Sequence, residues 1–289
     1  MTEDNTILIT KASGERVPFD VARLRRSLER SRAEPKAVDE VVNSILSLLH
    51  EGMTTKEIYR NAFALLRKGS SSTAARYKLK NAIMELGPAG FAFEKYVAAL
   101  LKEEGYETRT GEFVQGVCVT HEVDVIAERN GVRCMIECKF HSDKGKYSDV
   151  KIPLYIRSRF VDVEQAWQQD SAHQGKRFEG WVVTNTRFTT DAVKYGSCVG
   201  LTLIGWDTPK AGSLNERIDR AGLHPITSLT TISLAEKKML LAQDVVLGHE
   251  LCQRPQLLDM AGISKNRKKR ILQEARELCD LTTNNHHGQ

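Results

Sequence analysis

The chain has 289 residues, of which 41% are apolar and 27% are charged. This composition is typical of a globular protein that is long enough for two or three domains with cores of their own. No apolar run reaches the ~20 residues of a spanning helix, and the polar, acidic start lacks a secretory signal, so we expect neither a membrane protein nor a secreted one. The six cysteines show no CxxC spacing, which predicts reduced thiols in a cytoplasmic protein.

The net charge of +5 is unevenly distributed along the chain. Residues 1–88 hold 15 basic and 11 acidic side chains, and residues 223–289 hold 9 and 7. The middle of the chain, with 18 basic and 19 acidic side chains, is close to neutral. This distribution predicts polyanionic partners for the two ends.

Breaks at Gly87-Pro88 and in the polar segment 207–213 divide the sequence. We therefore expect domains at residues 1–88 and 89–210, followed by a linker and helical region at 211–289. A polar tail over residues 282–289 is expected to be disordered.

The hydrophobic periodicity predicts the elements of each region. A hairpin (7–9 and 17–19) and helices, with Thr54 or Thr55 as a cap and a closing helix over 73–86, are expected in the first region. The middle region alternates strands with helices, which indicates a mixed α/β sheet flanked by helices. Its expected elements are a helix over 91–104, strands over 115–120, 123–128 and 132–140, a helix over 163–169, a strand over 181–184, a helix over 190–195 and a strand over 201–204. The last region reads as helices only.

The stretch 123–139 predicts a β-hairpin that brings charged side chains together. Asn130-Gly131, between two β-prone runs, is typical of a two-residue type I′ turn. With that turn, the numbers of paired residues add up to 261, so Asp124 lies opposite Glu137, and Lys139 shares their face. The other face carries apolar side chains suited to a core: Val123, Val125, Ala127, Cys134, Ile136 and Cys138.

Two opposed carboxylates destabilise a hairpin unless a positive charge balances them. Asp124 and Glu137 are therefore candidate ligands of Mg²⁺ or Mn²⁺, which prefer oxygen donors. Lys139 can orient a water molecule or stabilise the charge that develops on a phosphate. A solvated hairpin face with a cross-strand Glu–Lys pair fits the spacing at least as well.

A family resemblance favours the metal site. Asp124 followed by Glu137-Cys138-Lys139 resembles the signature of the PD-(D/E)xK nucleases, with Val123 in place of the proline. Residues 91–97 look like the opening helix of the Mrr-type restriction endonucleases, and residues 180–193 are similar to their later strand, threonine-rich loop and helix. The resemblance spans about residues 89–206 and implies a metal-dependent DNA endonuclease in which Glu94 joins the site.

Other readings of the polar residues near this hairpin stay open. Glu94 is equally typical of a residue at the border of an apolar helix face. Arg157 and Arg159 are either ligands of a DNA phosphate or residues that flank a strand.

The first region carries a second resemblance. Residues 9–24, 52–58 and 74–78 resemble the ATP-cone, a helical bundle capped by a small hairpin that binds ATP or dATP without hydrolysing it. No GxxxxGK[ST] sequence occurs, so we expect no hydrolysis through a P-loop.

Three residues of this region are candidates for binding the nucleotide as a regulatory ligand. Lys11 on a strand and Arg23 on the next helix can converge on a triphosphate, and Thr55 can offer its hydroxyl. Ala12 stands where the family usually has arginine, and Arg23 where it usually has lysine, which leaves the identity of the nucleotide open.

The last region contains a basic run at a predicted helix start, after a glycine turn at Gly262. A short helix, a turn and a basic helix are typical of modules that grip the DNA backbone. A solvated amphipathic helix is an equally good interpretation. The candidate DNA-binding residues are Lys265, Arg267, Lys268, Lys269 and Arg270.

Together these observations predict a Mg²⁺-dependent DNA endonuclease regulated by ATP or dATP, with a role in restriction or defence. The alternatives are a non-catalytic, nucleotide-sensing DNA-binding regulator with a nuclease-like fold, and a nuclease for RNA or for particular nucleic-acid structures. The sequence leaves open whether the chain forms a homo-oligomer.

Overall fold

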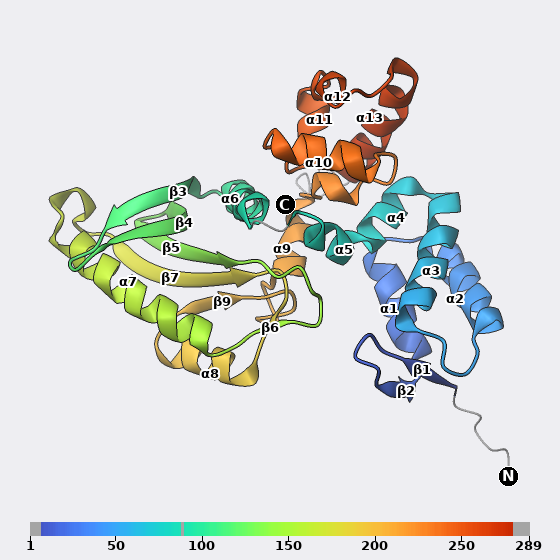
Figure 1. The fold of residues 1–289 in the computed structure, drawn as a ribbon, viewed down its shortest axis with the longest axis horizontal. Coiled ribbons are helices and arrows are strands. Elements are labelled where there is room, and N and C mark those ends of the chain that lie inside the picture. Colours follow the sequence, from blue (N-terminus) through green and yellow to red (C-terminus); the bar gives the residue numbers. More distant parts are fainter. Residues whose placement is uncertain (1–6, 88–89, 280–289) are drawn as a thin grey trace, which may run out of the picture.

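The N-terminal part is a helical bundle with a two-stranded antiparallel hairpin at one end (Figure 1). The structure, a computed structural model, describes residues 7–87 and 90–279. Thr54 caps the third helix and forms a capping box with Glu57, which leaves Thr55 free of the capping role. The elements are β1 (Leu8–Thr10), β2 (Arg16–Pro18), α1 (Val21–Arg30), α2 (Pro35–Leu48) and α3 (Thr55–Gly69).

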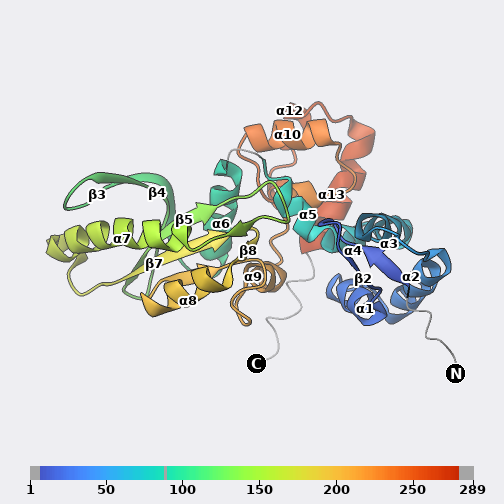
Figure 2. The same ribbon diagram turned by 60° about the horizontal axis from the view of Figure 1, so that its bottom comes forward.

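Two short helices follow where the sequence predicts one helix over residues 73–86. They are α4 (Ser71–Tyr77) and α5 (Leu79–Met84), and Ser70 caps the first of them. The division allows neighbouring residues to face different cores: Ala74 packs in the bundle, Ala75 among the C-terminal helices and Leu79 beneath the central sheet. Both ribbon views place α5 between the N-terminal bundle and the sheet (Figure 1, Figure 2).

The central part is a five-stranded mixed sheet of order β3-β4-β5-β7-β9, which confirms the predicted α/β class. Strands β3, β4 and β5 are antiparallel, and β5, β7 and β9 run parallel to one another. Its strands are β3 (Glu107–Gln115), β4 (Thr120–Arg129), β5 (Val132–Lys139), β7 (Arg177–Thr184) and β9 (Thr202–Ile204); β6 (Tyr147–Ser148) and β8 (Arg187–Phe188) form a separate parallel pair.

Helices cover both faces of this sheet. Under one face lie α6 (Phe91–Glu103) and α9 (Leu214–Ala221), which pack on Val125 and Ile136. Against the other lie α7 (Lys151–Gln169) and α8 (Thr190–Cys198), which pack on residues such as Ile126. The hairpin β4–β5 is therefore apolar on both faces along most of its length.

Two sequence expectations for this part are wrong. Residues 115–120 were expected as a strand, but the first strand is β3, and most of that segment forms the turn into β4. As an edge strand, β3 alternates exposed and half-buried residues, so it has no apolar run. The helix expected over 163–169 already begins at Lys151, with Pro153 tolerated in its first turn.

The C-terminal part is helical, as predicted, and has its own apolar core. It contains α10 (Leu234–Ala242), α11 (Glu250–Gln253), α12 (Leu257–Met260) and α13 (Lys265–Cys279). The region expected as linker and helices, 211–289, begins with α9, whose Leu214 and Ile218 belong to the core under the sheet. Among the described residues, no helix has the length and apolarity to cross a bilayer. The tail 282–289 lies outside the described residues.

Candidate functional site

Asp124 and Glu137 lie on the neighbouring antiparallel strands β4 and β5. Asn130 and Gly131 both have positive φ angles, of 51° and 74°, as a type I′ turn requires. The pairs run from Arg129–Val132 to Val125–Ile136, which is the register expected from the sequence. Asp124 and Glu137 follow directly after the last of these pairs, and the charge of Asp124 acts on Glu137, so the two carboxylates lie near each other where the β4–β5 ladder ends.

The side chain of Asp124 takes over the last hydrogen bond of this ladder. Its Oδ2 accepts from the Cys138 backbone N–H at 2.7 Å. The alternation of β4 breaks here, because Val123 packs with the α7 side while Val125 packs on the α6 side. The expectation that Val123 shares the face of Val125 is therefore wrong, and the break occurs at the residue with the candidate metal ligand.

Arg159 balances the charge of Glu137. Its Nη1 donates to Glu137 Oε2 at 2.7 Å, and its Nη2 donates to the carbonyl oxygen of Glu122. Both side chains of the ion pair are largely buried, at 13% and 15% exposed. Arg159 lies within helix α7, so it does not flank a strand. The sequence indicated Arg159 only together with Arg157, as a candidate ligand of a DNA phosphate, and did not predict its ion pair with Glu137.

Burial dominates the electrostatics of the two carboxylates. It raises the pKa of Asp124 above its usual range, partly offset by the hydrogen bond from Cys138. Burial and then the charge of Asp124 raise the pKa of Glu137. The positive charge of Lys139 acts on both in the opposite direction. The cluster thus holds more negative charge than its environment stabilises.

Glu94 belongs electrostatically to the same site although it comes from α6. It lies in the first turn of that helix. Burial, followed by the charges of Asp124, Glu122 and Glu137, raises the pKa of Glu94 to about 7. The structure therefore brings Glu94 near the paired carboxylates.

The donor set suits a hard divalent cation. Carboxylate oxygens are the preferred ligands of Mg²⁺ and Mn²⁺, and a bound cation would reverse the raised pKa values of Asp124 and Glu137. Within residues 7–87 and 90–279, no group of three or more His, Cys, Asp or Glu side chains could hold a metal ion. Two carboxylates would therefore need backbone carbonyls and water to complete the coordination.

The three predicted nucleotide ligands line one pocket of about 430 Å³ in the N-terminal bundle. Lys11 and Arg23 contribute to its wall together with Thr55, and Lys11 Nζ also pairs with Glu15 at 2.9 Å. The structure thus brings together residues that are 44 positions apart in the sequence.

Three further residues that line this pocket were not predicted from the sequence as ligands. Tyr59 and Tyr77 line it with stacked rings, 5.1 Å between centroids and 10° between planes. Lys80 also lines it, and its Nζ lies 5.7 Å from the ring centroid of Trp206, a residue of the central part. Of these three residues, Tyr77 lies within the segment 74–78 that resembles the ATP-cone, so the resemblance could have indicated it as a pocket residue.

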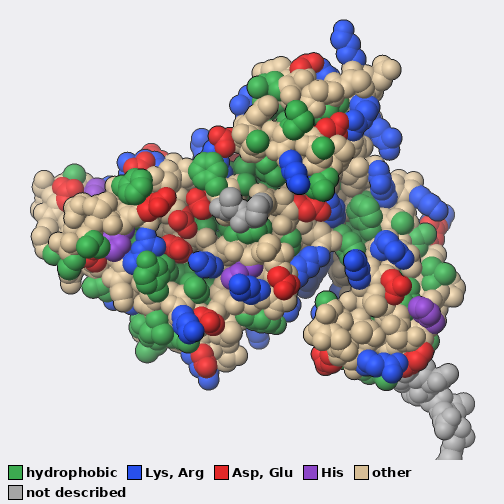
Figure 3. Space-filling model, viewed as in Figure 1, with side chains coloured by type: hydrophobic (Ala, Val, Ile, Leu, Met, Phe, Trp, Pro, Cys, Tyr) green, Lys and Arg blue, Asp and Glu red, His purple; other side chains and the backbone are tan. Residues whose placement is uncertain are grey.

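The basic run of the last region lies at the start of α13, as predicted, after Gly262 with a φ of 70°. Arg267 donates to Glu236 at 3.0 Å, and Lys268 pairs with Asp259. These two cations therefore already have carboxylate partners within the C-terminal part. Lys265, Lys269 and Arg270 are exposed, and Figure 3 shows basic side chains over these helices.

Comparisons with known proteins match three successive segments of the chain. The family model described as ATP cone domain matches residues 7–86, the model described as restriction endonuclease matches residues 88–208, and the AF1548-like, C-terminal model matches residues 224–279. An uncharacterised protein of Archaeoglobus fulgidus is 36% identical over 187 residues, which are 63% of this chain and 99% of that protein.

Solved structures give two further likenesses. The crystal structure of a protein of unknown function, AF1548, is 34% identical with a TM-score of 0.54, and the match covers 66% of this chain and 98% of that one. The MspJI restriction endonuclease in complex with a 27-mer oligonucleotide is 13% identical with a TM-score of 0.32, over 86% of this chain and 52% of that one.

Proposed function

Because this chain belongs to the AF1548-like family and joins an ATP cone domain to a restriction endonuclease domain, we propose that it is a metal-dependent DNA endonuclease regulated by ATP or dATP. The observation that carries the proposal is the proximity of Asp124 and Glu137 at the end of the β4–β5 ladder. Their raised pKa values indicate carboxylates that are poised for a cation.

Each residue of the site has a role in this proposal. Asp124 and Glu137 would hold Mg²⁺ or Mn²⁺, which supplies charge neutralisation at the phosphate and activation of water. Lys139 orients the attacking water or stabilises the charge on the phosphate, and Glu94 completes the acidic cluster. The buried face behind the carboxylates keeps their geometry rigid.

The nucleotide and DNA sites are part of the same proposal. Lys11 and Arg23 would bind the triphosphate, with Thr55 as a hydroxyl donor, and no hydrolysis is required for regulation. The exposed cations at the start of α13 would contact the DNA backbone. We further propose a cytoplasmic role in restriction or defence, consistent with free thiols at Cys118, Cys134, Cys138 and Cys198.

Cleavage of supercoiled plasmid tests the nuclease. We expect Mg²⁺-dependent nicking by the wild type, changed by ATP or dATP, and loss of nicking in Asp124→Ala and Lys139→Ala. Lys146→Ala, an exposed lysine on the following loop, is the matched control and should cleave normally. Equal cleavage by the wild type and both site variants would overturn the assignment.

One observation favours a second candidate, a nucleotide-sensing DNA-binding regulator without catalysis. The Arg159–Glu137 ion pair already neutralises one of the two metal ligands. Such a protein would bind DNA in response to nucleotide but would show no cleavage with any divalent metal on DNA or RNA. A substrate panel of duplex, single-stranded and structured DNA and RNA separates the two and identifies the nucleic acid that is cleaved.

A further inference from the structure

A second cavity, of about 240 Å³, lies between the ATP cone domain and the C-terminal helices. The cone contributes Tyr59, Phe63, Arg67, Lys78 and Asn81 to its wall, and α10 contributes Lys237. Neither the nuclease site nor the nucleotide pocket accounts for this cavity. At ~30 Å³ per water molecule it offers room for about eight waters, or for a small solute in their place.

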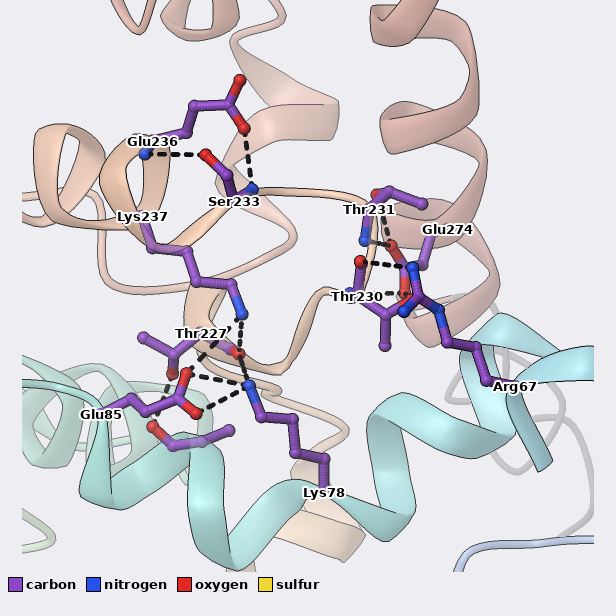
Figure 4. A network of polar contacts seen from close by, with 11 residues as sticks. Arg67, Lys78, Glu85, Thr227, Thr230, Thr231, Ser233, Glu236, Lys237 and Glu274 are labelled. Carbon is purple, nitrogen blue, oxygen red and sulfur yellow. Dashed lines mark hydrogen bonds and ion pairs between the residues drawn. The ribbon is translucent and has the colours of Figure 1, made fainter. Parts of the chain in front are cut away.

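Two lysines in this cavity compete for the same acceptors. Lys78 Nζ donates to Glu85 at 2.8 Å and to the Thr227 carbonyl oxygen at 3.2 Å. Lys237 Nζ donates to the same carbonyl oxygen at 2.7 Å and lies 3.6 Å from the same carboxylate. Figure 4 shows both ammonium groups pointing toward this shared pair of acceptors from opposite sides of the interface.

The cations around the cavity outnumber the available carboxylates. Among the residues that the structure describes, Arg67 donates to a backbone oxygen, that of Thr230, at 3.3 Å, and to no carboxylate. Glu274 lies close by, but its two oxygens accept four hydrogen bonds from the backbone and hydroxyl groups of Thr230 and Thr231. In the described part of the chain, Glu85 is thus the carboxylate that pairs with both Lys78 and Lys237.

Two of these cations, Lys78 and Lys237, are largely buried at 17% and 6% exposed, so their charge is costly without an anion. Burial, and then the charge of Lys78, lowers the pKa of Lys237 to about 8. The side chains of these lysines and of Arg67 have hydrogen-bond donors and no acceptors. A phosphate-type anion has the complementary set, because its charged oxygens accept hydrogen bonds.

We propose that this cavity binds a small phosphate anion of the orthophosphate or pyrophosphate class, held by Arg67, Lys78 and Lys237. Such an anion would link the cone to the C-terminal helices, because its ligands come from both parts. Tyr59 lines this cavity and the nucleotide pocket alike, so the two sites share a wall. Lys144, on the loop after the strand with Lys139, reaches Asn81 and lies 5.9 Å from the Tyr59 ring centroid, which brings the nuclease domain to the same junction.

Calorimetric titration of the full chain with pyrophosphate tests this inference. All proteins carry Arg23→Gln, which weakens the contribution of the nucleotide pocket to the measured binding. We expect Lys237→Met and Arg67→Gln, added singly to this background, to weaken pyrophosphate binding by at least about tenfold each. Arg60→Gln, an exposed arginine on the same helix as Arg67, is the matched control and should bind as the background does.

Two results would overturn the proposal: absence of pyrophosphate binding in the background protein, or binding that neither substitution weakens. Because Arg67 is exposed, its substitution tests the site even if Lys237→Met fails to fold. A parallel titration with AMP distinguishes a free anion from a nucleotide phosphate as the source. Binding of AMP that depends on Arg67 and Lys237 would identify a nucleotide phosphate, whereas binding of pyrophosphate without AMP would identify a free anion. The readout is binding, so it does not depend on the nuclease activity.

Discussion

Arg159 of helix α7 reaches the carboxylate of Glu137 on β5, with 2.7 Å between Nη1 and Oε2. The guanidinium occupies the position of a counter-charge beside a candidate metal ligand. Arginine and a divalent cation would therefore compete for the same carboxylate.

Replacing Arg159 by methionine should make the site more dependent on metal. The change leaves a largely buried carboxylate unpaired and should cost about 3 kcal/mol in the free energy of unfolding without metal. Added Mg²⁺ or Mn²⁺ should restore part of this loss, so the metal-induced rise in Tm should exceed that of the wild type. Arg157→Met, two positions earlier on α7, is the control, and equal metal-induced shifts in Arg159→Met and wild type would argue against competition.

The nucleotide pocket predicts selective loss of ATP binding in Arg23→Gln. Loss of one charged donor to a triphosphate should weaken ATP and dATP binding by roughly tenfold to a hundredfold, measured by calorimetry. Arg25→Gln removes an arginine of the same helix that pairs with Asp39 at 2.7 Å and does not line the pocket. Equal affinities in the two variants would contradict the assigned pocket.

Helix α5 predicts shared stability between the cone and the nuclease domain. Ile83 is fully buried in the core beneath the sheet, although it lies within the segment matched to the ATP cone domain. Ile83→Ala should cost about 2–5 kcal/mol and lower the unfolding temperature of both domains together. Leu46→Ala, at a 42% exposed position of α2, should have little effect. Separate transitions, with only one of them shifted, would show that the domains unfold independently.

Buried His224 predicts a specific dependence of stability on pH. Burial and then the charge of Arg76 lower its pKa to about 3, so the folded state keeps it neutral while the unfolded chain binds a proton below about pH 6.5. The free energy of unfolding should therefore fall as the pH drops through this window, by up to about 1.4 kcal/mol per pH unit.

The variant His224→Asn should lack this contribution, as measured by urea unfolding between pH 4 and 7. Asp219, whose pKa is raised to about 6, acts with the opposite sign, so the informative quantity is the difference between wild type and variant. His50→Gln, at an exposed position, serves as the control. An unchanged slope in His224→Asn would contradict the prediction.

The start of α13 predicts that its lysines differ in function. Substituting Lys265 and Lys269 with glutamine should weaken DNA binding and reduce the slope of log affinity against log salt by about 1 for each lost phosphate contact. Lys268 forms an ion pair with Asp259, so Lys268→Gln should reduce the salt slope less than Lys265→Gln or Lys269→Gln does. Unchanged binding in the double variant would remove α13 from the DNA interface.

Local chemistry made the site hairpin predictable. A two-residue Asn-Gly turn determines which residues face one another, so the register from Arg129–Val132 to Val125–Ile136 follows from the sequence alone, whereas the break in alternation at Asp124 does not. The capped helices and the separation into an N-terminal bundle, a mixed sheet and terminal helices follow from periodicity and turn signals. The edge strand β3 could not be predicted from the sequence, because half of its side chains are exposed to solvent and the strand has no apolar pattern.

The sequence by itself therefore determined the hairpin that carries the two candidate carboxylates, and three of the residues that line the nucleotide pocket: Lys11, Arg23 and Thr55. Only the tertiary structure decided that Arg159 neutralises Glu137, that Glu94 approaches the site from α6, and that α4 and α5 contribute to three cores. The physical reason is that register depends on adjacent residues, whereas these contacts depend on how separate apolar faces are buried against each other, which no local pattern encodes.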